Sequence, residues 1–171
     1  MLIYKDIISG DEMISDAFNM TLINDIVYEV DCKMITVRKG ADVDIGANAS
    51  TQEAAEALDD GQEEVIDVVH SFRLTQTGFN RASYITYFRG YVAKLMEKLA
   101  ERGASPAEIE RIKARAQGFA SSYLTGARFK GCDFYMGESM DVDGMVVLLN
   151  FRDAGNPYMA FLKDGLEEVK V

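Results

Sequence analysis

The central part of the chain carries hydrophobic residues at the spacing of α-helices. After Asn80, a residue suited to cap a helix, apolar side chains recur every three or four positions. A second helical pattern follows Ser105 and Pro106, a pair typical of a helix start, and Gly126 is a natural stop. Because few residues separate the two patterns, the sequence predicts an antiparallel helical hairpin over about residues 80–126.

Short β-branched and aromatic runs on both sides of this hairpin predict strands. They cover residues 1–8, 26–30, 34–37, 64–74, 132–137, 145–152 and 158–163. The runs 26–30 and 34–37 are separated by three residues and predict a β-hairpin. Strands do not alternate with helices along the chain, so we expect an α+β fold of mainly antiparallel strands. No repeat or linker divides the sequence, and we expect one domain over residues 1–171.

Charge is distributed unevenly along the chain. The formal net charge is −10, but residues 80–130 hold ten Lys and Arg against four Asp and Glu. Residues 40–67 instead hold nine acids and no base. The part from about 40 to 64 has almost no large apolar residue to offset the entropy of ordering, which predicts a mobile acidic loop. The sequence therefore predicts an acidic pole and a basic pole on one protein.

The basic pole is the predicted helical hairpin. Lys94, Lys98 and Arg102 follow each other at intervals of four and predict a stripe on the first helix, with Arg111 and Arg115 on the second. These cations form either a solvated helix face or a docking arm for acidic partners such as acidic protein surfaces. We expect no direct nucleic-acid binding, because the aromatic residues belong to the apolar face of the hairpin.

Calcium is the metal that the acidic loop suggests. Hard cations prefer several oxygen ligands, and Asp42, Asp44 and Asn48 are the candidates for a weak site. The loop does not complete an EF-hand pattern, so a solvated acidic loop is the alternative interpretation. We expect no required cofactor.

Catalytic patterns are absent from the sequence. The chain has one histidine, His70, which we expect on a strand at or near the surface and not in a catalytic role. None of the common nucleophile, zinc or phosphate-loop motifs occurs. No secretory signal and no apolar run long enough for a membrane span is present. We therefore expect a cytoplasmic, monomeric binding protein that is not an enzyme.

Several stretches resemble one known family in order along the whole chain. Residues 129–151 are similar to the second sequence signature of the translationally controlled tumour proteins. Residues 1–16 and 161–168 resemble the two ends of that family. Residues 45–50 resemble the first signature. This chain departs from the signature at residues 51–52, where the family usually has an acid at the second position.

The resemblance implies a fold and a set of partners. It implies a β-tent similar to that of the Mss4 family, with an inserted helical hairpin and a flexible acidic loop. Family members are associated with small GTPases of the Rheb type, translation elongation factor complexes, tubulin, calcium and anti-apoptotic Bcl-family proteins. Glu12 matches the residue tied to the GTPase interaction, although it could simply be a turn acid that accepts from nearby backbone N–H groups. A regulatory binding protein that supports translation, growth and survival is the implied function, and a calcium buffer or sensor and a microtubule-stabilising adaptor are the alternatives.

Overall fold

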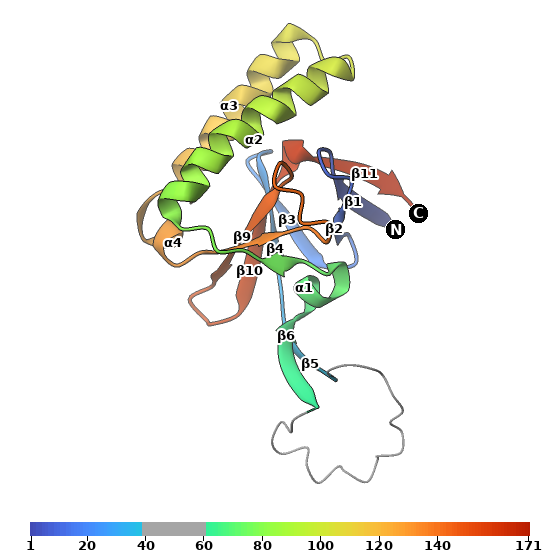
Figure 1. Ribbon diagram of the computed structural model, residues 1–171, viewed down its shortest axis with the longest axis vertical. Helices are drawn as coiled ribbons and strands as arrows, with labels where there is room; N and C mark the ends of the chain where they lie inside the picture. Colours follow the sequence, from blue (N-terminus) through green and yellow to red (C-terminus); the bar gives the residue numbers. More distant parts are fainter. Residues whose placement is uncertain (39–60) are drawn as a thin grey trace.

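The computed structural model describes residues 1–38 and 61–171 of the chain (Figure 1). The first group of elements is β1 (Leu2–Asp6), β2 (Glu12–Ser15), β3 (Asn19–Ile23), β4 (Val27–Asp31), β5 (Met34–Arg38), β6 (Gln62–Ile66), α1 (Asp67–Phe72) and β7 (Thr75–Gln76). The second group is α2 (Arg81–Glu101), α3 (Pro106–Tyr123), α4 (Gly126–Lys130), β8 (Asp133–Met136), β9 (Val146–Phe151), β10 (Pro157–Leu162), η2 (Lys163–Gly165) and β11 (Leu166–Lys170).

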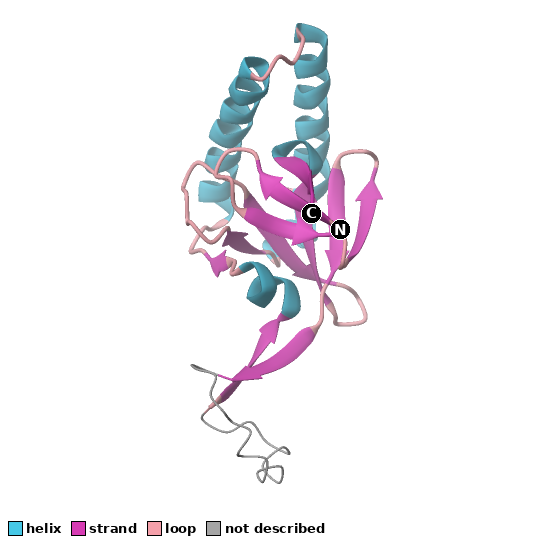
Figure 2. Cartoon of the chain, turned by 90° about the vertical axis from the view of Figure 1, so that its right-hand side faces the viewer, coloured by secondary structure: helices cyan, strands magenta, loops and turns pink. Residues whose placement is uncertain are grey.

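The strands form three antiparallel sheets. A six-stranded sheet has the order β3-β4-β10-β9-β8-β7, a three-stranded sheet has the order β11-β1-β2, and β5 pairs with β6. Figures 1 and 2 show the β5–β6 ribbon on one side of this body and the α2–α3 hairpin on the opposite side. The predicted antiparallel α+β architecture with a helical hairpin is confirmed.

The core lies where the hairpin meets the six-stranded sheet. All six residues of β10 are buried, because this strand lies inside the sheet between β4 and β9. Aromatic rings of α2 pack on the sheet and on the second helix: Tyr84 stacks on Phe134 of β8 with ring centroids 4.7 Å apart, and Phe88 stacks on Phe119 of α3 at 5.4 Å. Burying one such ring stabilises the fold by roughly 1.5–3 kcal/mol. The apolar stripe of the sequence is thus the contact between hairpin and sheet.

The predicted helix starts are observed. The side chain of Asn80 accepts a hydrogen bond from the Ser83 N–H at 2.8 Å, and Ser105 accepts from the Glu108 N–H at 3.1 Å. These bonds satisfy N–H groups that the first helical turn leaves free. Gly103 has a φ of +102°, a left-handed conformation that lets the chain reverse between α2 and α3. None of the described helices is long and apolar enough to cross a membrane.

The predicted hairpin of runs 26–30 and 34–37 is wrong. β4 pairs with β3 and β10, whereas β5 pairs with β6. The link between β4 and β5 does not turn back, because the Cys32 N–H donates to the Pro157 carbonyl at 2.9 Å and the side chain is buried. The chain therefore leaves the six-stranded sheet and enters the small ribbon.

The predicted strand over 64–74 is also partly wrong. β6 ends at Ile66, and residues 67–72 form the short helix α1, so His70 is an exposed helical residue. The Asp67 carboxylate accepts a hydrogen bond from the Lys33 N–H at 3.0 Å, directly after β6 ends at Ile66. The predicted acidic loop lies mostly outside the described residues, and its last residues, 62–64, belong to β6.

Candidate functional site

Glu12 lies at the first position of β2, on the edge of the three-stranded sheet, and is exposed. It borders a polar cleft of about 500 Å³. The cleft is lined by residues of the β1–β2 loop, the end of α1 and the loop after β8: Gly10, Asp11, Glu12, Ser71, Phe72, Arg73 and Glu138. Three carboxylates and one guanidinium face this space, which gives it an acidic character.

The carboxylate of Asp11, and not that of Glu12, accepts the hydrogen bonds of this loop region. Its carboxylate accepts from the N–H of Ser139 at 3.2 Å, from the hydroxyl of Ser139 at 2.7 Å and from the hydroxyl of Ser9 at 3.1 Å. Gly137 lies so close that any side chain there would overlap the Asp11 carboxylate. Within the described residues the side chain of Glu12 makes no hydrogen bond or ion pair, although its backbone pairs with β1. Its carboxylate is therefore free to bind a partner.

Asp6 anchors the loop that carries these acids. It is 2% exposed and accepts from the Ile8 N–H at 2.9 Å, the Ser9 hydroxyl at 2.7 Å and the Met145 N–H at 2.7 Å. Burial raises the pKa of Asp6, while these hydrogen bonds act in the opposite direction. Asp6 thereby fixes the β1–β2 loop to the loop before β9, and the cleft has a rigid wall on the Glu12 side.

Arg73 and Glu138 form an ion pair on the other wall, with 3.1 Å between guanidinium and carboxylate. The side chains are 75% and 57% exposed, so water screens the pair and it contributes at most about 1 kcal/mol. Arg73 has a left-handed backbone with φ of +55°, and its N–H donates to the Val69 carbonyl at the end of α1. A charged group from a partner can displace this weak pair.

The predicted basic stripe divides into two kinds of residue. Lys94 pairs with Asp143 at 2.7 Å, and Arg102 pairs with Glu167 at 2.8 Å. Lys98, between them, makes no ion pair within the described residues. Two of the three stripe cations therefore hold α2 against the β-body.

The second helix shows the same division. Arg115 donates two hydrogen bonds to the Asp164 carboxylate at 2.8 and 3.0 Å, which raises the pKa of Arg115. Arg111, one turn earlier, is exposed and makes no ion pair within residues 1–38 and 61–171. The structure thus brings Arg102 and Arg115 to the junction with the body, whereas the half-buried Lys98 and the exposed Arg111 make no ion pair within the described residues.

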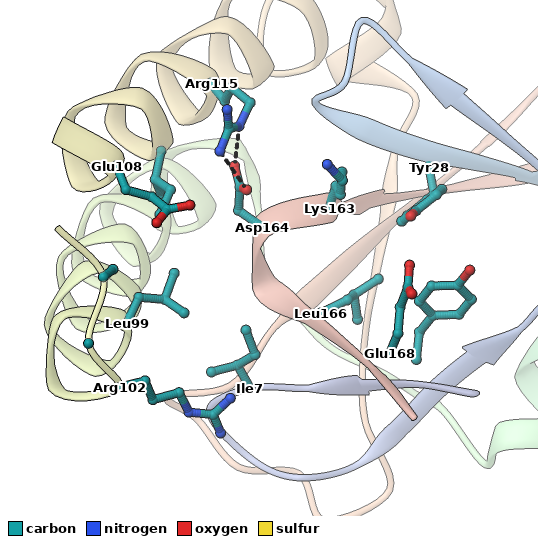
Figure 3. A pocket seen from close by; sticks show the side chains of 14 residues that line it. Ile7, Tyr28, Leu99, Arg102, Glu108, Arg115, Lys163, Asp164, Leu166 and Glu168 are labelled. Carbon is teal, nitrogen blue, oxygen red and sulfur yellow. Dashed lines mark hydrogen bonds and ion pairs between the residues drawn. The ribbon is translucent and has the colours of Figure 1, made fainter. Parts of the chain in front are cut away.

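A cavity of about 590 Å³ lies at this junction (Figure 3). Figure 3 shows Arg115 and Leu99 of the hairpin across from Ile7 and Leu166 of the body, with Asp164 bound to Arg115. Its lining combines apolar and charged side chains. The Arg115–Asp164 ion pair beside this cavity joins the hairpin to the body.

The calcium candidates Asp42, Asp44 and Asn48 lie outside the described residues, and calcium binding stays a prediction. Within the described part of the chain, no group of three or more His, Cys, Asp or Glu side chains is placed to hold a metal ion. His70 borders a separate surface hollow beside Val65.

Sequence reasoning missed Arg73 and Glu138 as neighbours of Glu12. Glu138 belongs to the stretch that resembles the family signature, which was the available signal for it. Arg73 follows a helix too short to show its period. The cleft joins residues more than 60 positions apart, so its composition depends on the tertiary fold.

Comparison with known proteins gives one consistent family. A family model described as "Translationally controlled tumour protein" matches residues 1–167. The translationally-controlled tumor protein homologs of Schizosaccharomyces pombe and Yarrowia lipolytica are 49% and 51% identical, and the matches cover 99% and 100% of both chains.

Solved structures agree with this match. A translationally controlled tumor-associated protein from Schizosaccharomyces pombe has a TM-score of 0.78 at 49% identity over 100% of both chains. The translationally-controlled tumor protein of Caenorhabditis elegans has a TM-score of 0.69 at 27% identity over 100% of this chain and 99% of that one. The chain therefore belongs to the translationally controlled tumour protein family.

Proposed function

We propose that the chain is a regulatory binding protein whose Glu12 cleft contacts a small GTPase of the Rheb type or a translation elongation factor complex. One observation carries the proposal: Glu12 is an exposed carboxylate without a partner among the described residues, on a wall that Asp6 and Asp11 hold rigid. A rigid wall loses little conformational entropy on binding, which favours recognition. The protein acts in this proposal by association and not by catalysis.

The charges of the cleft favour a basic side chain on the partner. Glu12 and Glu138 can both reach a lysine or arginine that enters the cleft, and Arg73 is released from its exposed pair when this happens. Complementary charges also speed the encounter of two proteins and make it sensitive to salt. Binding through this cleft should therefore weaken as the ionic strength rises.

The test is a binding measurement with purified Rheb-type GTPase and wild-type, Glu12→Ala and Glu110→Ala chains. Glu110 is an exposed acid on α3, so its variant changes the net charge equally without touching the cleft. Loss of one interfacial charge pair should raise the Kd of Glu12→Ala roughly tenfold, which corresponds to about 1.4 kcal/mol. Glu110→Ala should bind like wild type. Equal binding by all three chains would sink the assignment of Glu12.

Binding of tubulin or microtubules by the hairpin is a second proposed function. It is supported by the half-buried Lys98 and the exposed Arg111, which have no carboxylate partner among the described residues. The double variant Lys98→Glu/Arg111→Glu should co-sediment less with microtubules than Lys170→Glu, which alters a charge on β11. Lys94 and Arg102 are unsuitable for this test, because both are already paired with carboxylates of the body. Unchanged co-sedimentation of the double variant would mean that these cations are only solvated.

A further inference from the structure

Among the described residues that line the Glu12 cleft, Arg73 is the basic one. Its guanidinium donates a hydrogen bond to the Glu138 carboxylate at 3.1 Å, on the wall opposite Glu12. The proposed function brings a lysine or arginine of a partner to these same carboxylates. A cation of the protein itself therefore already occupies the place that the proposed function gives to a cation of the partner.

The backbone around Arg73 is fixed on both sides, which holds its side chain at the cleft. The N–H of Arg73 donates to the Val69 carbonyl, and so does the N–H of the buried Leu74, at 3.0 Å. Before it, Phe72 packs edge-on against Phe18 with ring centroids 5.9 Å apart. Glycine is the usual residue in a left-handed conformation after a helix, because a Cβ atom makes that conformation unfavourable. An arginine held there against this preference is the kind of strained residue that occurs at binding sites.

Glu138 is the carboxylate of the cleft whose charge Arg73 balances. Asp11 already accepts hydrogen bonds from Ser139, and the Glu12 side chain has no partner among the described residues. A guanidinium has five N–H donors and can therefore bond to two carboxylates at once. With Arg73 out of the way, Glu12 and Glu138 are both open to one entering cation.

We propose that Arg73 is an internal competitor for the Glu12 cleft. It holds Glu138 in the free protein and lowers the affinity of the cleft for the arginine or lysine side chain of a partner, which displaces it on binding. The inference rests on the proposed function, because it concerns the affinity of the same cleft. It adds a regulating residue, Arg73, to the binding residue Glu12.

The competition should be mild. The Arg73 and Glu138 side chains are 75% and 57% exposed, so water screens their attraction. If the pair is closed in about two thirds of the molecules, the fraction ready to bind is about one third, and the apparent Kd is about threefold higher than without the pair. Added salt weakens the pair further, so the effect of Arg73 should shrink as the ionic strength rises.

Binding of purified Rheb-type GTPase to four chains tests the competition. Arg73→Gln removes the cation, Arg73→Lys keeps it, and Arg89→Gln removes an exposed cation of α2 that does not line the cleft. At low salt Arg73→Gln should have a Kd about threefold below that of the wild type, and the other two variants should bind like the wild type. Where the GTPase binds the wild type, an Arg73→Gln chain that binds no more tightly than Arg89→Gln would overturn the proposal. Equal tightening by Arg73→Lys would overturn it too, because the charge would then not be the competing group.

A small cation separates this inference from the identity of the partner. N-acetyl-arginine amide carries one guanidinium, and its titration is followed through the backbone amide signals of Glu12 and Glu138 in nuclear magnetic resonance spectra. Half-saturation should need about threefold less of this probe with Arg73→Gln than with the wild type or Arg89→Gln. Equal titrations, or unchanged signals in every chain, would overturn the proposal.

The two measurements distinguish failure of the inference from failure of the proposed function. If the probe gives the expected difference while the GTPase binds none of the chains, the proposed function fails and the competition by Arg73 stands. If the GTPase binds and Glu12→Ala weakens it while Arg73→Gln changes nothing, the proposed function stands and the competition is refuted. Circular dichroism checks that all variants are folded.

Discussion

Two buried tyrosines on the same face of α2 should respond to the same substitution with opposite signs. Tyr84 is 2% exposed and donates its hydroxyl proton to the Val146 carbonyl at 3.0 Å. Tyr91 is 3% exposed, and within the described residues its hydroxyl is the buried side-chain polar atom that lacks a hydrogen-bond partner. The Tyr91 hydroxyl instead lies against the backbone of Gly165, in the turn before β11. Replacing each tyrosine by phenylalanine keeps the ring and removes only the hydroxyl.

The expected free energies follow from the hydrogen bonds. A satisfied hydrogen bond contributes about 0.5–1.5 kcal/mol, so Tyr84→Phe should lower the free energy of unfolding by about 1 kcal/mol. A buried polar group without a partner costs about 1–3 kcal/mol, and removing it returns part of this. The small void left by the oxygen offsets some of the gain. Tyr91→Phe should therefore raise the free energy of unfolding by about 1 kcal/mol.

Urea unfolding followed by far-ultraviolet circular dichroism measures this difference of about 2 kcal/mol. The two variants should share the slope of the wild type and shift the midpoint in opposite directions. The same difference should separate their thermal midpoints by roughly 4–8 °C for a domain of this size. If Tyr91→Phe loses as much stability as Tyr84→Phe, the hydroxyl has a partner such as an ordered water, and the reasoning is refuted.

Three further predictions concern single positions. Gly165→Ala should lower the free energy of unfolding by about 1–3 kcal/mol, because the added methyl group overlaps the Tyr91 hydroxyl. Gly90→Ala, which has open space on α2, should raise it by up to about 1 kcal/mol, and urea denaturation of both variants checks the contrast. Arg115→Ala should lower the free energy of unfolding by about 2 kcal/mol by leaving its half-buried carboxylate partner unpaired, and Arg111→Ala should change it by less than about 0.5 kcal/mol. Burial raises the pKa of Cys32 to about 12 from its ordinary 9.0, so above pH 9 the thiol ionises in the unfolded chain first and the free energy of unfolding should fall as the pH rises. Cys32→Ala should make this fall with pH less steep. An unchanged pH dependence would contradict the buried thiol.

The helical hairpin could be predicted because its signals are local. The apolar period of α2 and the caps Asn80 and Ser105 lie within the segments that they specify. Strand pairing depends on contacts between distant parts of the chain, so β4 and β5 were correctly expected as strands but assigned the wrong partners. The six residues of α1 cover less than two turns, too few to reveal a helical period in the sequence.

The candidate site was only partly predictable for the same reason. Glu12 was found through its resemblance to a family position, and nothing in the local sequence distinguishes it from Asp11. The structure separates the two acids, since Asp11 is used by the Ser139 loop and Glu12 is not. Arg73 itself has a left-handed backbone conformation directly after the short helix α1, and this conformation places it at the cleft. The sequence contains no signal for it.

The hairpin cations show how periodicity can locate a charged face without giving its role. Lys94 and Arg102 are eight residues apart, about 12 Å along α2, and reach two different segments of the body, at Asp143 and Glu167. Lys98 lies between these anchors and reaches neither. A pattern that indicates a docking stripe is thus partly a set of contacts with the body, and of the five predicted cations Lys98 and Arg111 are the two that make no ion pair within the described residues. An acidic partner of the hairpin should therefore lose affinity when those two are reversed.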